Sequence, residues 1–252
     1  MHKYNHSDPC CDQGTEKTHF NLVGEFHFTF DHPLRTTPYY ECFDNDKKLL
    51  YFRLSLIKEE MKEFTVALEK NDMIEMADAL CDLSYVTYGA GHCLGIDIDR
   101  LLVDMKINLT TPENILSVNK LSSKTKNKIK KYLNLIDKCI NSFSNSIDTH
   151  DMGEIAEYLA YILKHAYALG HMLNFNMDKM FREVHRSNMT KVCSSIDDAN
   201  TSIDLYRNDP EKRYQTPLIK LKGSYYVIYD EISTKILKNY KWEKPNIKQF
   251  FT

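Results

Sequence analysis

The chain has 252 residues, with 33 Lys or Arg against 35 Asp or Glu and a formal net charge of −2. This balance produces no global field that would indicate nucleic acid or a membrane surface as partner. The seven cysteines are odd in number and lack paired spacing, which excludes a disulfide framework. There is no apolar leader and no apolar run as long as a membrane span, so we expect a soluble cytoplasmic protein of one large or two small domains.

The N-terminal part of the chain divides into a polar segment and an aromatic one. Residues 1–20 are polar, and we expect a flexible segment. Phe26, Phe28 and Phe30 then alternate with other residues, which predicts a short helix or extended segment that packs its aromatic rings onto the body of the protein.

From Lys48 the pattern is helical. Apolar residues recur every three or four positions and form one buried seam: Leu50, Leu54, Ile57, Met61, Phe64 and Leu68. Asp72 is positioned to cap a second helix, which is apolar on nearly all sides and should end at Gly95. A third helix should open at 96–99, and Thr111-Pro112 predicts the cap and first turn of a further one.

Two acidic clusters lie on the first two helices, which are joined by one short turn. They are Glu59, Glu60 and Glu63 on the first helix and Glu75, Asp78 and Asp82 on the second. Residues three or four apart share a helix face, and like charges at that spacing cost roughly 0.2–0.5 kcal/mol per pair. A divalent hard cation such as Mg²⁺, held by carboxylate oxygens, would offset this repulsion. A solvated acidic face is the alternative for the first cluster, but the second lies on a largely buried helix, where carboxylates need partners.

The sequence from 54 to 104 recurs 79 positions later, at 133–183, without a gap. Fourteen residues are identical in the two copies: Leu54, Leu56, Ile57, Phe64, Asp72, Met73, Glu75, Ala77, Leu80, Tyr88, Gly91, His92, Leu94 and Asp99. We interpret the two copies, about 48–111 and 127–192, as an internal repeat of one helical unit.

The copies differ where the acidic clusters lie. The positions of Glu59, Glu60, Glu63 and Asp82 hold Lys138, Cys139, Ser142 and Tyr161 in the second copy, and Glu75 and Asp78 correspond to Glu154 and Glu157. The second copy should therefore have lost the metal. It ends instead in a basic stretch, 181–191, and residues from 203 onward are basic and loop-rich, with a predicted hairpin at 218–229.

These motifs resemble a known superfamily. Glu59-Glu60-x-x-Glu63 followed by Glu75-x-x-Asp78 is similar to the signature of the all-α nucleoside triphosphate pyrophosphohydrolases, which include MazG. The stretch from Asp78 to Gly89, the later run Glu183-Val184-His185-Arg186-Ser187-Asn188-Met189-x-Lys191 and the lysine-rich tail from Lys235 resemble its phosphoribosyl-ATP pyrophosphohydrolase-like branch. The resemblance covers roughly residues 26–191 and the tail.

The resemblance implies an all-α fold in which two helical hairpins form a four-helix core. Here the two repeats would supply both hairpins within one chain, either as a monomeric pseudo-dimer or in a homodimer. We expect one domain at 21–205 and a basic C-terminal tail at 206–252.

It also implies the reaction, in which a nucleoside triphosphate is hydrolysed to the monophosphate and pyrophosphate. Mg²⁺, with Mn²⁺ as an alternative, would be held by Glu60, Glu63, Glu75 and Asp78. Glu59 or Asp82 would take the proton of the attacking water.

Basic and aromatic side chains complete the expected site. Phosphates would be bound by Arg186, Lys191, Lys235 and Lys238, and the rest of the substrate by His185, Asn188, Phe26, His27 and Tyr85. Each has a structural alternative: Arg186 is also spaced to pair with Glu183, the tail lysines could be solvated, and the aromatic residues could belong to the core.

Two other interpretations compete with a pyrophosphohydrolase. A di-iron carboxylate bundle needs Glu-x-x-His pairs in its core, and the only such pair is Glu16-x-x-His19 in the polar segment, so we reject it. A non-catalytic nucleotide sensor or assembly protein on the same fold is the alternative in another class. The intact acidic clusters of the first copy argue against it. The sequence does not indicate which nucleobase is bound.

Overall fold

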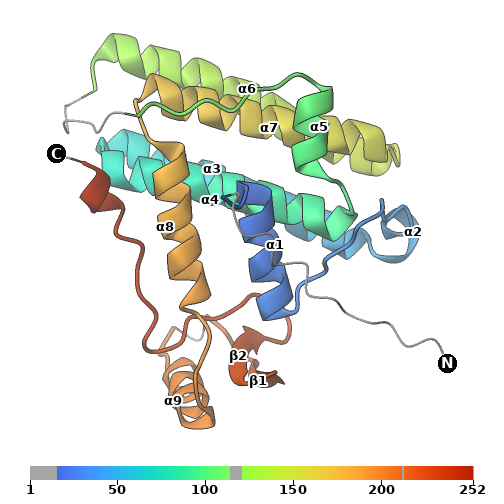
Figure 1. The fold of residues 1–252 in the computed structure, drawn as a ribbon, viewed down its shortest axis with the longest axis vertical. Coiled ribbons are helices and arrows are strands. Elements are labelled where there is room, and N and C mark those ends of the chain that lie inside the picture. Colours follow the sequence, from blue (N-terminus) through green and yellow to red (C-terminus); the bar gives the residue numbers. More distant parts are fainter. Residues whose placement is uncertain (1–15, 114–120, 212, 252) are drawn as a thin grey trace.

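Two helical hairpins form the centre of the molecule. The computed structural model describes residues 16–113, 121–211 and 213–251. The first hairpin is α3 (Lys47–Lys70) with α4 (Met73–Leu94), and the second is α6 (Ser123–Asp148) with α7 (Met152–Met172). α4 packs on α7 and α3 on α6, so the four long helices lie together as a bundle (Figure 1). The all-α fold expected from the sequence is confirmed.

The first hairpin forms because its apolar seam and its caps agree. All six seam residues of α3 are buried, and Phe64 is fully enclosed. Asn71 ends α3 in the left-handed conformation at φ 54°. The Asp72 carboxylate then accepts hydrogen bonds from the backbone N–H groups of Ile74 and Glu75, at 3.1 Å each, and starts α4.

The second hairpin repeats these features at the spacing of the sequence repeat. His150 takes the left-handed conformation in place of Asn71, and Asp151 caps α7 by accepting from the N–H of Glu154. Phe143, the counterpart of Phe64, is also fully buried. The two hairpins therefore correspond in element order and in their caps, and descent from a duplicated unit stays a prediction.

A glycine in each hairpin lets the following helix approach closely. α5 (Ile98–Asp104) follows α4, and α8 (Met177–Met189) follows α7. A Cβ added at Gly91 would lie 2.6 Å from the side chain of Ile98, and one added at Gly170 would lie 2.7 Å from Met177. Both contacts are too short for a real Cβ, so the two glycines are required by the same packing.

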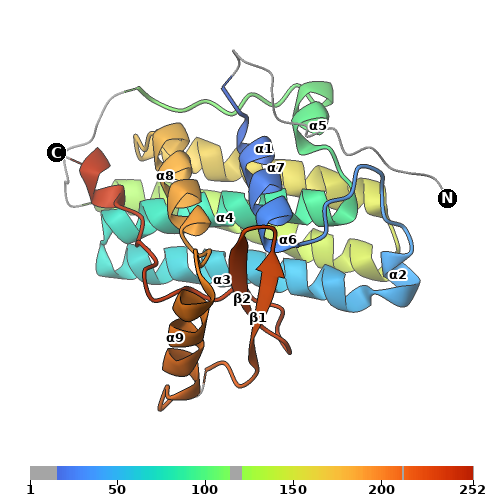
Figure 2. The ribbon, with the colours of Figure 1, turned by 60° about the horizontal axis from the view of Figure 1, so that its bottom comes forward.

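α1 (His19–Phe30) and α8 cross the same face of the bundle (Figures 1 and 2). Both pack on α4 and on each other. The expected flexible segment at 1–20 lies mostly outside the described residues, but its last two residues belong to α1. His19 contacts Tyr167 and Asp178, and Phe20 stacks on His92 with ring centroids 3.8 Å apart, so the expectation is wrong for these two.

A second, smaller apolar core lies beside the bundle. It joins α9 (Ile196–Arg207) to an antiparallel hairpin of β1 (Pro217–Lys222) and β2 (Tyr225–Asp230), as expected for 218–229. Its buried residues are Cys193, Ala199, Ile203, Ile228 and Leu237. This cluster spans residue 205, at which the sequence analysis placed the end of the helical domain.

The remaining elements are short. α2 (Cys42–Asn45) precedes α3, and the 3₁₀ helix η1 (Ile247–Phe250) packs against α4 and α8. The predicted cap at Thr111-Pro112 is wrong: 111–113 are not helical, and α6 begins at Ser123 with Ser122 as its cap. Thr111 instead donates a hydrogen bond to the Phe175 carbonyl.

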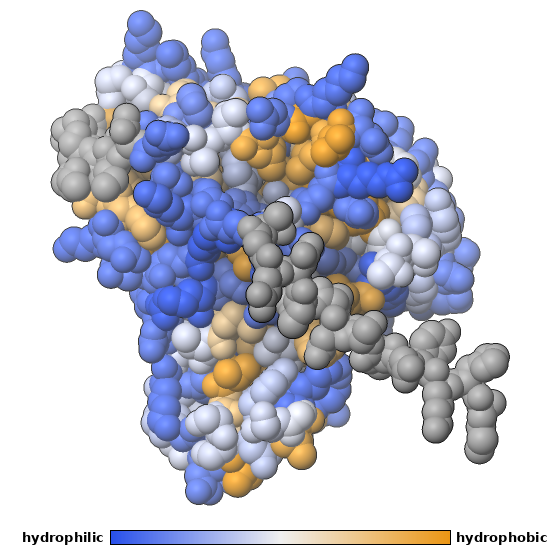
Figure 3. Space-filling view, viewed as in Figure 1, coloured by the Kyte–Doolittle hydropathy of each residue, from blue (hydrophilic) through white to orange (hydrophobic). Residues whose placement is uncertain are grey.

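The surface mixes polar and apolar areas. Hydrophilic residues cover much of the face in Figure 3, and apolar patches lie among them. Within the described residues, no helix is long and apolar enough to cross a membrane. The five cysteines in this part of the chain are all free and buried.

Candidate active site

A cavity of about 380 Å³ lies where α3, α4 and α8 meet the C-terminal tail. We call it the acidic pocket. Its carboxylates are Glu59, Glu60, Glu63, Asp78 and Asp82, and its cations include Lys191, Lys235, Lys238 and Lys244. The first hairpin therefore supplies the acids, while the end of α8 and the tail supply lysines.

Helix geometry brings the acids together. Glu60 and Glu63 are three residues apart on α3, and Asp78 and Asp82 are four apart on α4. The two helices form an antiparallel hairpin, so the acids of α3 and the acids of α4 lie side by side in the pocket wall and form one acidic stripe.

Burial and the repulsion of neighbouring carboxylates raise the pKa values of Glu60, Asp78 and Asp82. The pKa of Glu60 rises to about 9 because its carboxyl is buried and faces Asp82, Glu63 and Glu59. Burial is the main cause that raises the pKa of Asp82 to about 7, and the negative charge of Asp78 adds to it. Burial is also the main cause that raises the pKa of Asp78 to about 6, followed by the charge of Glu75. The protein thus holds carboxyl groups where their charged form is unfavourable without a counterion.

Two carboxylate oxygens in the pocket wall lack partners. Oε2 of Glu60 and Oδ1 of Asp78 are buried and accept no hydrogen bond from any residue that the structure describes. Such atoms cost free energy in a folded protein unless a ligand satisfies them. Their all-oxygen chemistry suits Mg²⁺, which prefers carboxylate ligands. Among the described residues, no three acidic, His or Cys side chains stand close enough together to enclose an ion.

Lys191 extends from just after α8 to the acids. Its Nζ donates to Oδ1 of Asn188 at 2.7 Å and lies 5.7 Å from the ring centroid of Phe26. Burial lowers the pKa of Lys191 to about 8, although Asp82 acts in the opposite direction. Lys191 is therefore a cation beside the acidic stripe that carries no carboxylate partner of its own within the described chain.

The tail crosses the pocket and brings three more lysines. Nζ of Lys235 lies 3.6 Å from the Glu59 carboxylate, and that of Lys244 lies 3.1 Å from Glu75. Lys238 Nζ lies 3.6 Å from the ring centroid of Trp242. Glu75 therefore lies at the edge of the site, paired with the tail.

Two candidates from the basic stretch of α8 lie elsewhere. Arg186 is bound to Glu183, at 2.9 Å, and to Glu243, and it does not line the pocket. Its structural alternative is therefore the arrangement found. His185 is buried behind the pocket wall, where its Nδ1 lies 3.0 Å from the Tyr85 hydroxyl. Burial lowers the pKa of His185 to about 4, so it is neutral at pH 7.

The other expected substrate contacts do line the pocket. Phe26, His27, Tyr85 and Asn188 all contribute to its wall. Tyr85 packs edge-on to Phe26 and stacks on Phe181, with centroids 5.6 and 5.4 Å apart. These aromatic residues thus serve the core and the pocket wall together.

Several residues that line the pocket were not predicted from the sequence. Arg53, His32, Trp242 and Lys244 line the pocket but were not expected there. Arg53 precedes Glu60 by seven residues and so shares its helix face, which is a usable signal. Trp242 is the only tryptophan of the chain and lies between two tail lysines. Nothing local in the sequence places His32.

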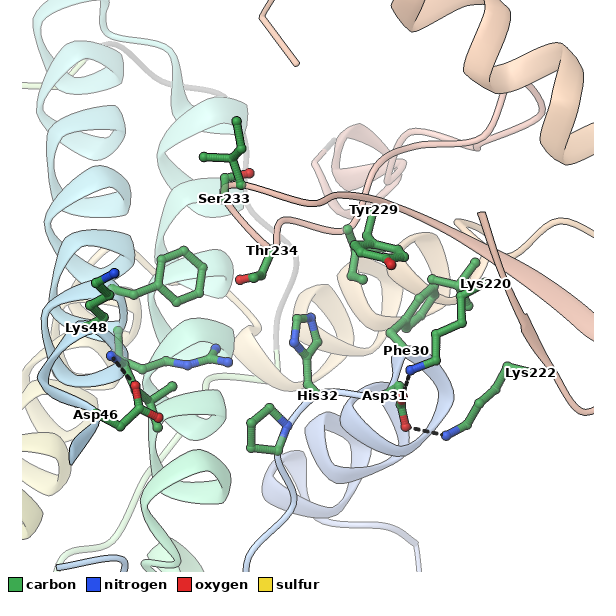
Figure 4. A pocket seen from close by; sticks show the side chains of 17 residues that line it. Phe30, Asp31, His32, Asp46, Lys48, Lys220, Lys222, Tyr229, Ser233 and Thr234 are labelled. Atoms are coloured by element: carbon green, nitrogen blue, oxygen red, sulfur yellow. Dashed lines mark hydrogen bonds and ion pairs between the residues drawn. The ribbon is translucent and has the colours of Figure 1, made fainter. Parts of the chain in front are cut away.

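A second cavity of about 590 Å³ adjoins the acidic pocket. We call it the side cavity. The two share His32, Phe52, Arg53, Thr234 and Ile236 in their walls. Figure 4 shows His32 and Thr234 among the side chains that line the side cavity. At one end, Lys220 and Lys222 both bind Asp31 and hold its pKa at about 2.

Comparisons with known proteins match both the first hairpin and nearly the whole chain. A family model described as phosphoribosyl-ATP pyrophosphohydrolase matches residues 23–106, which hold most of α1 and all of the first hairpin. A relative from Acanthamoeba polyphaga mimivirus, "Uncharacterized protein L479", is 33% identical over 237 residues, covering 91% of this chain and 94% of the relative. No solved structure matches the chain.

Proposed function

We propose that this chain, which belongs to the phosphoribosyl-ATP pyrophosphohydrolase family within the MazG-like superfamily, hydrolyses nucleoside triphosphates to monophosphates and pyrophosphate with Mg²⁺. The family supports a nucleotide pyrophosphohydrolase activity, and the triphosphate substrate and the metal are the finer parts of the proposal. The observation that carries it is the pair of buried, unpartnered carboxylate oxygens on Glu60 and Asp78, opposite lysines that line the same pocket.

The proposed metal ligands are Glu60, Glu63 and Asp78, with Glu75 at the edge, and these carboxylates would have to move closer together to enclose the ion. When bound there, Mg²⁺ would neutralise charge on the phosphate oxygens and on the bridging oxygen that leaves. The Glu75 carboxylate is engaged by Lys244 in this structure, so joining the site requires that ion pair to open.

The chain's own side chains do the remaining work. Lys191, Lys235 and Lys238 would bind and orient the triphosphate, because each lines the pocket and carries an ammonium group. Asp82 would hold the proton of an attacking water, and burial supports this role by raising its pKa to about 7, near the working pH of a general base. Glu59 is the alternative base, but it is exposed and faces Lys235.

The second hairpin supplies packing instead of chemistry. Cys139 and Ser142 replace two acids, and Glu154 accepts a hydrogen bond from Ser146 at 2.7 Å. We therefore propose one active site per chain, in a duplicated fold that acts as its own partner.

The test is a panel of ribo- and deoxynucleoside triphosphates with Mg²⁺, followed by pyrophosphate release. We expect turnover of at least one substrate and its loss in Glu63→Gln. Glu157→Gln, on the second hairpin, is the matched control and should retain activity. Nucleotide binding without turnover of any substrate would overturn the proposal and favour the sensor.

A further inference from the structure

Arg53 is a buried cation without a carboxylate partner. It is 5% exposed, and its Nε has no hydrogen-bond partner among residues 16–113, 121–211 and 213–251. No ion pair joins it to any acid in the described part of the chain, and the Cys93 thiol beside it is only a weak acceptor. A buried guanidinium is costly when its donors are unused, so Arg53 is poised for an acceptor that enters the cavities it lines.

His27 lies beside Arg53 and offers the opposite hydrogen-bonding character. Its Nδ1 lies 2.8 Å from the Pro33 carbonyl, which can only accept, so Nδ1 carries the proton. Burial and the charge of Arg53 keep the pKa of His27 well below its usual value. The ring is thus neutral, and Nε2 is an acceptor with no partner among the described residues.

These two polar groups converge over Gly89 of α4. A Cβ built on Gly89 would lie 3.0 Å from Nε2 of His27 and 3.5 Å from Nη1 of Arg53. The missing side chain therefore leaves open the space that a donor and an acceptor share. The second hairpin has Tyr132 and Ala168 at the positions of Arg53 and Gly89, so this pair occurs only where the acids occur.

The pair lies at the right separation from the acids. Arg53 precedes Glu60 by seven residues on α3, and Gly89 follows Asp82 by seven on α4, a rise of about 10 Å along each helix. One end of the pocket therefore holds the groups for phosphates and the other holds the Arg53–His27 pair. This separation matches the extent of a nucleotide from its phosphates to its base.

We propose that Arg53 and His27 read the base of the substrate and select those with a lactam edge, namely uracil, thymine, guanine and hypoxanthine. The carbonyl oxygen of that edge accepts from Arg53, and the adjacent ring N–H donates to Nε2 of His27. Adenine and cytosine present an amino group and a bare ring nitrogen, which reverses both partners. This inference rests on the proposed function for its choice of a nucleotide, but not on turnover.

Matched ligand pairs test the inference without hydrolysis. Calorimetry on the full chain with Mg²⁺ compares inosine with adenosine monophosphate, and uridine with cytidine monophosphate. Each pair differs at this edge alone. We expect the lactam member to bind at least about tenfold more tightly, because a buried donor and acceptor left unmatched strongly penalise the wrong ligand.

Two variants locate the preference. Arg53→Met should reduce the ratio within each pair to less than about threefold, while Arg35→Met, which loses a cation that contacts the Cys93 carbonyl and Tyr39, should keep it. If Arg53→Met does not fold, Gly89→Ala serves instead. It adds the residue that the second hairpin already carries, and it should also abolish the preference by filling the shared space.

Three results would overturn the inference. They are equal affinity within both pairs, tighter binding of the amino bases, and stabilisation by inorganic phosphate that Arg53→Met removes, which would make Arg53 an anion site. Absence of hydrolysis with the lactam preference intact would instead contradict only the proposed function.

Discussion

The two helical hairpins share a framework and differ in chemistry. Both use an aspartate cap, a left-handed residue between the helices and a glycine under the following helix. Within the part of the chain that the structure describes, only the first carries acids with unpartnered oxygens in a pocket. The packing features are therefore common to both hairpins, whereas the chemistry that we propose would belong to the first hairpin alone.

The largest expected effect comes from removing one charge at equivalent positions. Asp78→Asn should lower kcat/KM by about a hundredfold or more, because it removes a proposed metal ligand. Glu157→Gln, 79 residues later on an exposed face, should leave kcat/KM within about twofold. Steady-state pyrophosphate release with both variants checks this, and equal losses would mean that both hairpins carry working sites.

The next effect is on the free energy of unfolding, which a substitution in the site should raise, whereas most substitutions lower it. Glu60 folds with its pKa raised to about 9, so above its unfolded pKa its ionisation disfavours the folded state. Glu60→Gln should therefore stabilise the metal-free protein by about 1–3 kcal/mol, while it weakens any stabilisation by Mg²⁺. Thermal unfolding in EDTA and in Mg²⁺ measures both.

The reciprocal variant is the control for that experiment. Cys139 occupies the position of Glu60 in the second hairpin and is 9% exposed. Cys139→Glu buries a carboxyl among apolar residues and should destabilise the protein by about 2–4 kcal/mol. A neutral result would show that the second hairpin still tolerates acids at this position.

A smaller, pH-dependent effect distinguishes the two aspartates that follow the hairpins. Hydrogen bonds from His19 and Arg182 lower the pKa of Asp178 to about 2, whereas burial raises that of its counterpart Asp99. Because its pKa is lower in the folded state, the Asp178 carboxylate stabilises the folded protein at pH values above its unfolded pKa, near 4. This stabilisation is lost as the pH falls through the folded pKa of about 2. A raised pKa has the opposite sign.

Asp178→Asn should therefore lower the Tm at pH 7 by a few degrees, and the difference should shrink as the pH falls from about 4 to 2. Asp99→Asn should leave the Tm at pH 7 unchanged or raise it. Thermal melts of both variants and the parent across this range decide the point. A pH-independent penalty at Asp178 would indicate lost packing instead.

The smallest effect is expected at Arg186. Its guanidinium is engaged by Glu183 and Glu243 outside the pocket. Arg186→Gln should change kcat by less than about twofold, whereas Lys191→Met should raise KM by about tenfold. Michaelis–Menten kinetics on the same substrate compare them, and a large loss in Arg186→Gln would place this residue at the phosphates after all.

The sequence predicts well what is determined over one or two helical turns. The seam of α3, the Asp72 cap and the Gly95 stop all lie where periodicity and capping chemistry placed them. The acidic residues of the pocket follow for the same reason, since spacing alone puts them on one face of each helix.

Contacts between distant segments were not predictable from local pattern. Arg186 pairs with Glu183, which lies three residues before it, and with Glu243, which lies 57 residues after it. The second partner can be identified only when the position of the tail is known. The pairing of α9 with the β-hairpin depends on a few apolar residues scattered over some forty positions. Thr111-Pro112 has the composition of a helix cap, but the Phe175 carbonyl takes its hydroxyl instead.

Trp242 has a practical consequence. It is the only tryptophan in the chain, it lies in the pocket wall against Lys238, and its indole N–H is buried without a partner. Emission excited selectively at tryptophan, away from the 16 tyrosines, therefore comes from a single site, and we expect it to respond to ligands that enter the pocket. Nucleotide and metal titrations can be followed by intrinsic emission, with no label and no turnover, so the protein carries its own optical probe for every binding experiment described above.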